Sequence, residues 1–346
     1  MLNSTLIKNA SFKTLGIIGA GAFGTALAKA FAKNFENIIV YAREEQIVDG
    51  INNKNTNPFY LNNVELDKNI TATSDINNLS QANIVLITVP TQHIRAVISP
   101  LKLNKKTLVL IASKGIEIAT GTLISKVVHS TIKIPKKNIG VLSGPTFAHL
   151  IAAQMPSAFS VSFLNLKLAE LVAQHLSNEH IRCYYGNDPI GVQIAAAVKN
   201  VIAIACGVCV GLNLGHNALA TTITRSLKEI AIAIKFFKGN PQTAFGLTGI
   251  GDLILTTTSS ESRNFTLGSL IAKNKSFNSE LLKEVKGTPE GYYTALALYN
   301  IIKKHNLDMP ICAEIYEVLY NHKDIKSAIS SLMSRTIKED NYLTHL

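Results

Sequence analysis

The stretch LGIIGAGAFGTALAKAF, Leu15 to Phe31, joins a short apolar run, three closely spaced glycines and a segment rich in Ala and Leu. The glycines are Gly19, Gly21 and Gly24, in the pattern G-x-G-x-x-G. A short apolar run bounded by glycine is typical of a buried strand, and Ala and Leu have high helix propensity. The stretch therefore predicts a strand, a glycine turn and a helix in immediate succession, which is how many α/β folds begin.

Each glycine of such a turn has its own physical reason. The first permits the tight turn, the second lets the backbone approach a pyrophosphate, and the third lets the helix pack closely on the strand. The N-terminus of the helix then offers unpaired N–H groups to phosphates. We interpret the stretch as a dinucleotide-binding loop rather than a packed turn without a ligand, and we expect contacts from Gly19, Gly21, Ala22, Phe23 and Gly24. A signal-peptide core is disfavoured because no cleavage-like site follows.

The first half of the chain alternates short β-branched runs with helical patterns, as βαβ units do. Several of the runs are continuously apolar, which is typical of a parallel sheet covered by helices on both faces. The predicted fold class is α/β, with a Rossmann-type, doubly wound and mostly parallel sheet. We expect strands at 15–18, 38–41, 84–89, 107–112, 139–142, 158–163 and 181–185.

From about Gly191 onward the pattern is helical. We expect helices at 193–211, 217–237, 265–273, 291–305 and 311–321. The chain is long enough for two cores. We therefore predict a dinucleotide-binding domain over 1–190, with 1–13 as a short N-terminal extension, and an all-α domain over 191–346 that supplies substrate-binding and catalytic residues.

Composition narrows the class of partner. Apolar residues make up 47% of the chain and charged residues 16%, which is typical of a globular protein. The net charge is +11, but the Lys and Arg residues are scattered, so we expect no nucleic acid; a small phosphorylated substrate fits this balance. No charge-free apolar stretch reaches the length of a membrane span, and we predict a cytoplasmic protein without integral membrane association.

The four cysteines give no disulfide framework, which indicates a reducing compartment. Cys206 and Cys209 form a C-x-x-C inside an apolar helical run, with no second pair to complete a metal site. We interpret them as core residues and predict no metal.

The end of the second predicted strand bears on the choice of cofactor. About 20 residues beyond the glycine loop, an NAD-specific fold carries an acid that binds the ribose 2′-hydroxyl. Here the strand ends in VYAR, with Arg43 at that point. Because an arginine can accept a 2′-phosphate, we expect NADPH, or dual use of NADPH and NADH, rather than strict NAD. An exposed arginine that begins the next helix is the alternative.

Unusual polar or Pro/Gly groups follow three other predicted strands, at the edge where an open α/β sheet binds its ligands. Pro90-Thr91-Gln92 follows one, Ser113-Lys114-Gly115 the next, and Ser143-Gly144-Pro145-Thr146 the third. Each could be an ordinary turn. Three such ends at the edge that carries the glycine loop predict one lined cleft.

Five longer motifs occur in order: SKGIE (113–117), VLSGPTFA (141–148), VKNVIAIA (198–205), GIGDLILTTTSSESRN (249–264) and PEG (289–291). Together they resemble the bacterial NAD(P)-dependent glycerol-3-phosphate dehydrogenases, over about residues 15–338. The resemblance implies an enzyme that interconverts dihydroxyacetone phosphate and sn-glycerol 3-phosphate by hydride transfer with NADPH or NADH, and that supplies glycerophospholipid synthesis.

Lys199 lies in the middle of an apolar helical run rich in small residues. Desolvation there lowers the pKa of a lysine, so that it can exchange a proton near neutral pH. A lysine that snorkels from a helix end is the weaker alternative. The resemblance implies that Lys199 binds substrate and acts as the general acid/base. It also implies that Lys114 orients the substrate carbonyl and that Asp252 bonds substrate or fixes Lys199; a helix N-cap is the alternative for Asp252.

Ser262, Arg263 and Asn264 directly precede a helical run. A hydroxyl, a guanidinium and an amide at a helix N-terminus predict a phosphate site, with a simple capping turn as the alternative. The resemblance assigns these three residues to the substrate. It adds Gly144 and Thr146 to the substrate contacts, and Tyr60, Pro90, Lys114, Ala148, Arg263, Thr288 and Glu290 to the cofactor contacts.

The chain departs from the family pattern at a few places. Ala22-Phe23 stands where the family usually has Ser followed by Trp or Tyr, which removes one hydroxyl contact to phosphate, and Thr146 replaces a more usual Ser. Two other functions stay open: another two-domain NAD(P)-dependent hydroxyacid or hydroxyacyl dehydrogenase, and a non-catalytic dinucleotide-sensing module. The former should lack Ser262-Arg263-Asn264 beside a mid-helix lysine, and the latter has no need of Lys199. A homodimer is also left open.

Overall fold

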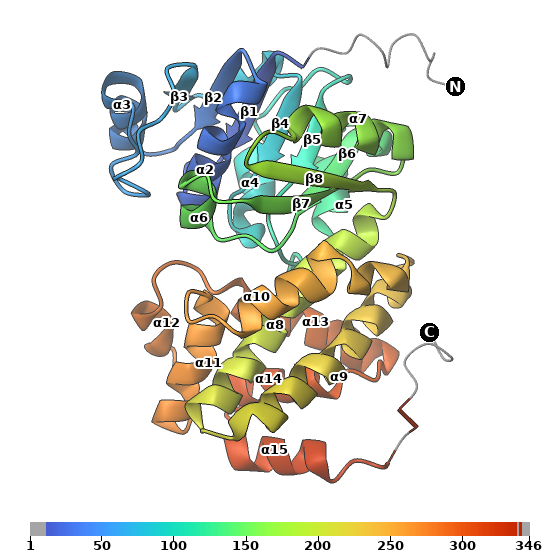
Figure 1. The fold of residues 1–346 in the computed structure, drawn as a ribbon. Coiled ribbons are helices and arrows are strands. Elements are labelled where there is room, and N and C mark those ends of the chain that lie inside the picture. The colour runs from blue at the N-terminus through green and yellow to red at the C-terminus, as the bar shows by residue number, and fades with distance from the viewer. Residues whose placement is uncertain (1–11, 338, 341–346) are drawn as a thin grey trace. The chain divides into compact units, whose positions relative to one another are not determined.

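The computed structural model describes residues 12–337 and 339–340, which divide into two compact units (Figure 1). The first unit comprises residues 12–113 and Ile124–Pro189, and the second comprises Lys114–Leu123 and the described residues from Ile190 onward. The short stretch that carries Lys114 thus belongs to the second unit, although it follows a strand of the first. Most of the predicted N-terminal extension lies outside the described residues.

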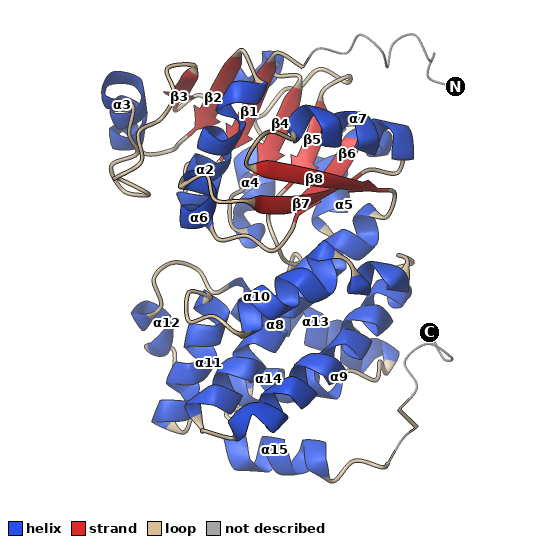
Figure 2. Cartoon of the chain, in the orientation of Figure 1, coloured by secondary structure: helices blue, strands red, loops and turns tan. Residues whose placement is uncertain are grey.

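The described part of the first unit carries an eight-stranded sheet in the order β3-β2-β1-β4-β5-β6-β7-β8 (Figure 2). Neighbouring strands are parallel except β6 and β7, which pair antiparallel. The predicted mostly parallel, doubly wound sheet is confirmed. The strands are β1 (Thr14–Ile18), β2 (Asn37–Tyr41), β3 (Ile70–Thr73), β4 (Ile84–Ile87), β5 (Leu108–Ile111), β6 (Ile139–Ser143), β7 (Ser157–Ser162) and β8 (Ile181–Gly186).

The central strands are continuously apolar because both faces of the sheet are covered. In β4, Ile84 and Leu86 belong to one apolar cluster, and Val85 and Ile87 to another on the opposite face. The helices of this unit are α2 (Ala22–Phe31), α3 (Glu45–Lys54), α4 (Ile94–Ile98), α5 (Ile124–Ile132), α6 (Ala148–Ala152) and α7 (Leu166–Leu176). Buried residues of α2, α3, α6 and α7 join the first cluster, and those of α4 and α5 the second.

Strand β3 was not expected from the sequence. Its four residues, ITAT, alternate between buried and more exposed positions, and the strand lies at one edge of the sheet. Two buried side chains, Ile70 and Ala72, are too few to produce a clear period of two. Pairing with β2 therefore decides this strand, rather than its own pattern.

The described residues of the second unit form helices and no named strand (Figure 2). The five predicted helices are confirmed within a few residues at their ends, and three shorter ones, α10, α12 and α15, were not predicted. The helices are α8 (Pro189–Gly211), α9 (Gly215–Phe236), α10 (Asp252–Thr257), α11 (Arg263–Asn274), α12 (Leu281–Glu284), α13 (Glu290–His305), α14 (Pro310–Tyr320) and α15 (Ile325–Met333).

Helix α8 is the central element of this unit. A Cβ on Gly207 would lie 2.0 Å from the carbonyl oxygen of Phe265, and a Cβ on Gly268 would lie 2.0 Å from that of Ile204. The backbones of α8 and α11 therefore touch, which only glycine permits at these positions. Helix α8 is long and apolar enough to cross a membrane, but 83% of its most hydropathic window is buried within the protein, as in a core helix.

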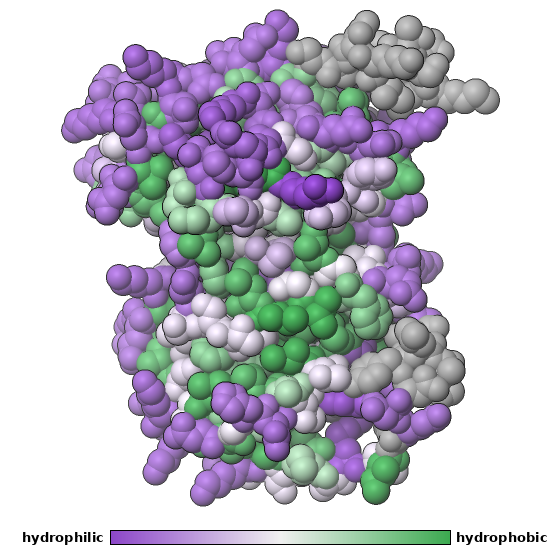
Figure 3. Space-filling view, viewed as in Figure 1, coloured by the Kyte–Doolittle hydropathy of each residue, from purple (hydrophilic) through white to green (hydrophobic). Residues whose placement is uncertain are grey.

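Both units expose some large apolar side chains. On the face seen in Figure 3, hydrophilic side chains cover most of the first unit, whereas apolar side chains gather over helices of the second. Exposed apolar residues of the second unit include Val210, Leu214, Phe245 and Ile254. Exposed apolar surface is compatible with self-association, and the homodimer stays a prediction.

Candidate active site

The loop between β1 and α2 carries the three predicted glycines, and the protein's own backbone requires glycine at two of them. Gly19 has a φ of +113°, which an L side chain rarely adopts. A Cβ on Gly24 would lie 1.9 Å from the carbonyl oxygen of Gly19, so this position tolerates only glycine. A Cβ on Gly21 would meet no atom within 4 Å, so packing within the protein does not require glycine there. Open space at Gly21 suits the approach of a ligand, and the contact with a pyrophosphate stays a prediction.

The N-terminus of α2 fits a pyrophosphate. Its N-cap is Gly21, no side chain caps its N–H groups, and its first turn holds no acidic residue. The helix dipole and the uncapped N–H groups both favour an anion at this point. Ala22 and Phe23 form the first turn and are half-buried. The residues present therefore fit the phosphates of NADH or NADPH.

Arg43 lies in the loop between β2 and α3. Its side chain is 86% exposed, and its guanidinium lies 3.0 Å from a carboxylate oxygen of Glu44. Helix α3 begins at Glu45, two residues later, so Arg43 precedes the helix instead of starting it. The exposed guanidinium lies just beyond the carboxyl end of β2, and its contact with a ribose 2′-phosphate stays a prediction.

The other predicted residues of the first unit follow carboxyl ends of parallel strands. Pro90 follows β4, and Gly144 and Thr146 follow β6. Strands β1, β4, β5 and β6 run parallel, so these residues lie at the same sheet edge as the glycine loop. Ala148 is the first residue of α6, and Tyr60 lies, exposed, in the loop between α3 and β3.

In the second unit, Asp252 joins two lysines. Its Oδ1 accepts a hydrogen bond from Lys199 Nζ at 2.8 Å, and its Oδ2 accepts one from Lys114 Nζ at 2.7 Å. Lys199 also donates to Thr256 Oγ1 at 2.6 Å. Asp252 is 1% exposed and Lys199 is 4% exposed, whereas the Lys114 side chain is 17% exposed. Two cations and one anion thus share a site from which water is mostly excluded.

Burial lowers the pKa of Lys199 to about 7, because the charged ammonium is desolvated; the Asp252 carboxylate opposes this effect and Lys114 adds to it. For Asp252, burial alone would raise the pKa, but the ammonium groups of Lys114 and Lys199 hold the pKa of this carboxyl below its usual range. Near neutral pH, Asp252 is therefore ionised, and Lys199 exchanges its proton readily.

Local structure delivers these groups to one point. Lys199 lies midway along α8, with apolar turns on both sides, so its side chain cannot snorkel to water. Asp252 is the first residue of α10 and directly follows a π-helical turn, Leu247–Gly251. The N-cap of α10 is Gly251, and the Asp252 carboxylate faces the lysines instead of capping the helix. Thr256 is four residues further on, on the same face of α10.

The Ser-Arg-Asn cluster divides into structural and exposed groups. Ser262 is the N-cap of α11, and its Oγ accepts from Phe265 N at 3.3 Å. Asn264 donates to Asn200 Oδ1 at 3.0 Å and accepts from Gly291 N at 2.9 Å, which links α11 to α8 and α13. Arg263 is exposed. The capping role of Ser262 is therefore present, and the substrate contacts of all three residues stay predictions.

Arg263 lies against a glycine. Gly287 has a φ of +87°, and a Cβ there would lie 3.1 Å from Arg263 Cζ and Nε. The guanidinium therefore passes directly over the backbone at Gly287. Thr288 follows, half-buried, and Glu290 begins α13.

Comparisons with known proteins identify the family of this chain. The sequence matches the family models described as the N-terminus and the C-terminus of NAD-dependent glycerol-3-phosphate dehydrogenase, over residues 14–169 and 188–330. The chain belongs to this family. Membership confirms the resemblance drawn from the motifs and the assignment to the NAD(P)-dependent oxidoreductases that act on a CH–OH group.

Named relatives cover nearly the whole chain. It is 37% identical over 331 residues to the glycerol-3-phosphate dehydrogenase [NAD(P)+] of Staphylococcus carnosus, covering 94% of this chain and 99% of the relative. It is also 37% identical over 329 residues to the enzyme of the same description from Staphylococcus aureus, covering 94% and 98%.

Solved structures share the fold. The crystal structure of glycerol-3-phosphate dehydrogenase from Coxiella burnetii superposes with a TM-score of 0.86 at 31% identity, covering 94% of this chain and 100% of the other. A D-mandelate dehydrogenase structure reaches a TM-score of 0.57 at 15% identity, covering 92% and 99%, which shows a shared fold alone.

Two residues near the reacting groups were missed in the sequence. Thr256 accepts from Lys199, and Asn200 bonds Asn264. The i, i+4 spacing of Asp252 and Thr256 on a short helix was the available signal for the first. Asn200 directly follows Lys199, but neighbours on a helix point in different directions, so adjacency alone could not place it.

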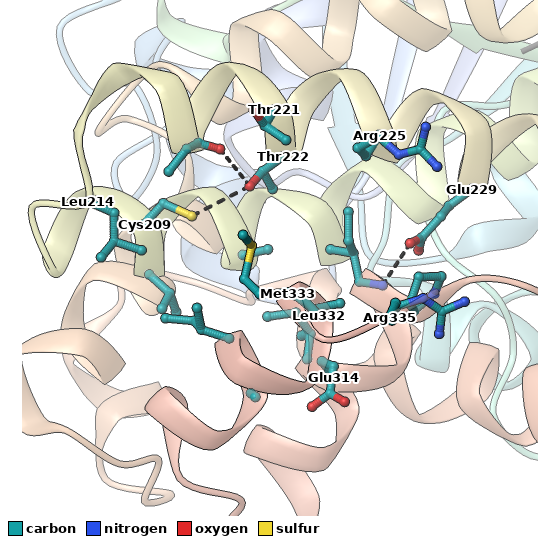
Figure 4. Close-up of a pocket in the computed structure, with 18 of the residues that line it drawn as sticks. Cys209, Leu214, Thr221, Thr222, Arg225, Glu229, Glu314, Leu332, Met333 and Arg335 are labelled. Carbon is teal, nitrogen blue, oxygen red and sulfur yellow. Dashed lines mark hydrogen bonds between the residues drawn. The ribbon is translucent and has the colours of Figure 1, made fainter. Parts of the chain in front are cut away.

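The second unit also holds a cavity of about 570 Å³ between α8, α9, α14 and α15 (Figure 4). Cys209 and Leu214 lie toward one end, and Arg225, Glu229 and Arg335 toward the other. Its lining does not include Lys114, Lys199 or Asp252. Glu229 accepts from Ile311 N and Cys312 N at the start of α14, so its buried carboxylate serves as a helix cap; burial raises its pKa to about 7.

Proposed function

We propose that this chain catalyses the reversible reduction of dihydroxyacetone phosphate to sn-glycerol 3-phosphate with NADPH or NADH. Reduction is the physiological direction and supplies glycerophospholipid synthesis in the cytoplasm. The observation that carries this proposal is the buried Lys199, which is bonded to Asp252 and whose pKa is lowered to about 7. A mid-helix ammonium tuned to neutral pH suits a reaction that moves one proton with each hydride.

The nicotinamide ring, when bound, supplies or accepts the hydride at the substrate C2 carbon. The proton on the C2 oxygen is transferred by a residue of this chain, Lys199. During reduction, Lys199 Nζ donates a proton to the oxygen on C2 as negative charge develops there. During oxidation, neutral Lys199 removes the proton from the C2 hydroxyl. A pKa near the working pH makes a group effective in both directions.

The groups around Lys199 orient its ammonium and the substrate, and they compensate charge. Lys114 is less buried than Lys199, and its ammonium suits a contact to the C2 oxygen, where it would stabilise developing negative charge. Asp252 holds both lysines in place and neutralises one positive charge, which keeps two ammonium groups tolerable in a buried site. Thr256 fixes a further N–H of Lys199, so that the ammonium has a defined direction.

Arg263 is proposed as the main contact to the substrate phosphate. Its exposed guanidinium is a planar donor that matches phosphate oxygens with two parallel hydrogen bonds. Ser262 and Asn264 add polar groups at the N-terminus of α11, with Gly144 and Thr146 as further substrate contacts. The cofactor contacts are those of the glycine loop together with Arg43, Tyr60, Pro90, Lys114, Ala148, Arg263, Thr288 and Glu290.

The test is a steady-state assay of dihydroxyacetone phosphate reduction, with NADPH and NADH in parallel. We expect turnover with both cofactors and a higher kcat/KM with NADPH, because Arg43 can bind a 2′-phosphate. Dihydroxyacetone without phosphate is the matched control, and it should react much more slowly. Turnover of a non-phosphorylated keto acid, with none of dihydroxyacetone phosphate, would contradict the proposal.

A further inference from the structure

Asn57 is the most completely buried polar side chain near the glycine loop, and none of the roles above uses it. It lies in the segment between α3 and β3, outside any helix or strand, with 0% of its surface exposed. A buried amide is costly unless its hydrogen bonds are satisfied. Such a group in a loop is therefore held for a reason, and its partners indicate what that reason is.

On one side, Asn57 is hydrogen-bonded to the glycine loop and to the start of α2. Its Nδ2 donates to the carbonyl oxygen of Ala20 at 2.8 Å and to Thr25 Oγ1 at 2.8 Å. Ala20 lies between the first two glycines of the loop, and Thr25 lies in the first turn of α2. Thr25 N in turn donates to Gly21 O at 2.9 Å. Asn57 is thus bonded to the backbone segment that fits the cofactor phosphates.

On the other side, Asn57 fixes two aromatic residues. Its Oδ1 accepts from Phe59 N at 3.1 Å and from Tyr60 N at 3.2 Å. With these four bonds, the amide uses both of its donors and both of its lone pairs. Phe59 is 55% exposed and Tyr60 is 45% exposed. Two neighbouring aromatic side chains are therefore held in the open by a fully buried amide.

The same segment is held in a strained conformation. Leu61 has a φ of +57°, a left-handed conformation that is costly for a leucine. At the other end, a Cβ on Gly50 of α3 would lie 2.6 Å from Pro58 Cδ, so the segment is packed tightly on the helix. Strain of this kind persists where the surroundings over-determine it, and it is concentrated at ligand clamps.

The position of the segment indicates which half of a dinucleotide it faces. In this fold the end of β2 meets the ribose of the adenosine half. Gly19 N donates to Tyr41 O at 3.1 Å, so the glycine loop and the end of β2 are adjacent. Helix α3 follows β2 directly, and the Asn57 segment follows α3. Asn57 bonds Ala20 of the glycine loop and the backbone N–H groups of Phe59 and Tyr60, so this aromatic segment adjoins the loop that the end of β2 also contacts.

We infer that Phe59 and Tyr60 form an aromatic wall against which the adenine ring of the cofactor stacks. Asn57 is the positioning residue that fixes this wall relative to the glycine loop. The inference rests on the proposed function only in that the chain binds a dinucleotide. Planar bases bind to exposed aromatic faces through stacking, and each such pair contributes a modest amount to the affinity. Asn57 acts on the cofactor only through the segments it joins.

The experiment measures binding, so that it does not depend on turnover. Dissociation constants are determined by calorimetry for ADP and for reduced nicotinamide mononucleotide, which represent the two halves of the cofactor. The variants are Phe59→Ala/Tyr60→Ala, whose side chains are exposed, and Asn57→Asp, which keeps the shape but loses both donors. The matched control is Asn52→Asp, because Asn52 ties α3 to Ala72 of β3 through the same amide chemistry and has no bond to the glycine loop.

We expect the double aromatic variant to bind ADP about tenfold more weakly, since each ring contributes about twofold to tenfold. Asn57→Asp should weaken ADP binding by about threefold or more. The triple variant combines Asn57→Asp with both alanine substitutions. It should bind ADP about as weakly as the double aromatic variant, because Asn57 acts through the two rings and the effects are therefore not additive. Binding of the nicotinamide fragment should change by less than twofold. Asn52→Asp should leave both fragments unchanged.

Three results would overturn the inference. The first is an ADP affinity unchanged in the aromatic variant, which decides the question even where Asn57→Asp fails to fold. The second is a loss confined to the nicotinamide fragment. The third is a lower melting temperature for Asn57→Asp with an unaltered ADP affinity, which would make Asn57 structural alone. Failure of the proposed reaction would instead leave these binding constants intact and appear as absent turnover of dihydroxyacetone phosphate.

Discussion

Replacement of Lys199 tests the centre of the proposed chemistry. An ordinary lysine at pH 7 is neutral in about one molecule in three thousand, whereas a lysine with a pKa of about 7 is neutral in about half. Lys199→Met removes both the charge and the proton. Lys199→Arg keeps a cation beside Asp252, but a guanidinium does not lose its proton in proteins. The pair of variants therefore separates charge compensation from proton transfer.

We expect kcat to fall by about 10²–10⁴ in both variants, which is the usual contribution of general acid/base catalysis and corresponds to about 2.7–5.4 kcal/mol. In the unmodified enzyme, reduction needs the protonated amine, so kcat/KM for dihydroxyacetone phosphate should fall as the pH rises above about 7. Oxidation needs the neutral amine, so kcat/KM for glycerol 3-phosphate should rise with pH and level off above about 7. Both inflections should vanish in Lys199→Arg.

The assay is initial-rate kinetics in both directions between pH 5.5 and 9, which spans roughly two units around the expected inflection. NADPH affinity and the melting temperature serve as controls, since a folded variant should keep the cofactor site of the first unit. Retention of more than about a tenth of the activity by Lys199→Met would refute the acid/base role. So would an inflection near pH 7 that persists in Lys199→Arg.

Three further predictions follow from the geometry. Arg263→Ala should raise KM for dihydroxyacetone phosphate by far more than KM for NADPH, and Gly287→Ala should act in the same direction, because its Cβ would crowd the guanidinium at 3.1 Å; equal effects of Arg263→Ala on both KM values would speak against a phosphate contact. Arg43→Ala should raise KM for NADPH by about threefold to thirtyfold and leave KM for NADH unchanged, because a charge-assisted hydrogen bond is lost at an exposed site; an equal rise for both cofactors in initial-rate assays would exclude a 2′-phosphate contact. Gly21→Ala should fold with an unaltered melting temperature and lose NADPH affinity, whereas Gly24→Ala should lower the melting temperature, because its Cβ would lie 1.9 Å from a carbonyl oxygen; equal melting temperatures would show that the third glycine is not a packing requirement.

Much of the fold was predictable from local pattern. The apolar runs at β1, β4, β5 and β6 are continuous because both faces of the sheet are covered at these strands. Four or five residues are enough to recognise this pattern in the sequence. Helices α8, α9 and α13 are long enough for their character to be clear from the sequence. Strand β3 and helix α12 have four residues each, and neighbouring segments decide their conformation.

The sequence suggested residues for the candidate site but said little about how they are arranged. The motifs identified Lys114, Lys199 and Asp252 separately, yet Lys114 and Asp252 are 138 residues apart and Lys199 and Asp252 are 53 apart. Nothing local indicated that one carboxylate bonds both lysines. Ser262 and Asn264 were expected at the substrate, which stays a prediction. The structure shows that Ser262 caps α11 and that Asn264 ties α11 to α8 and α13.

The sequence by itself determined that a glycine turn follows a strand and opens a helix, that a sheet domain precedes a helical one, and that a lysine lies within an apolar helix. These properties depend on spacing and on the nature of adjacent residues. The tertiary structure alone decided that Asp252 sits between two ammonium groups, that Thr256 fixes Lys199, and that Asn57 joins the glycine loop to two exposed aromatic rings. The reason is physical: the pKa of Lys199 and the bonds of a buried amide depend on desolvation and on partners brought together from distant parts of the chain.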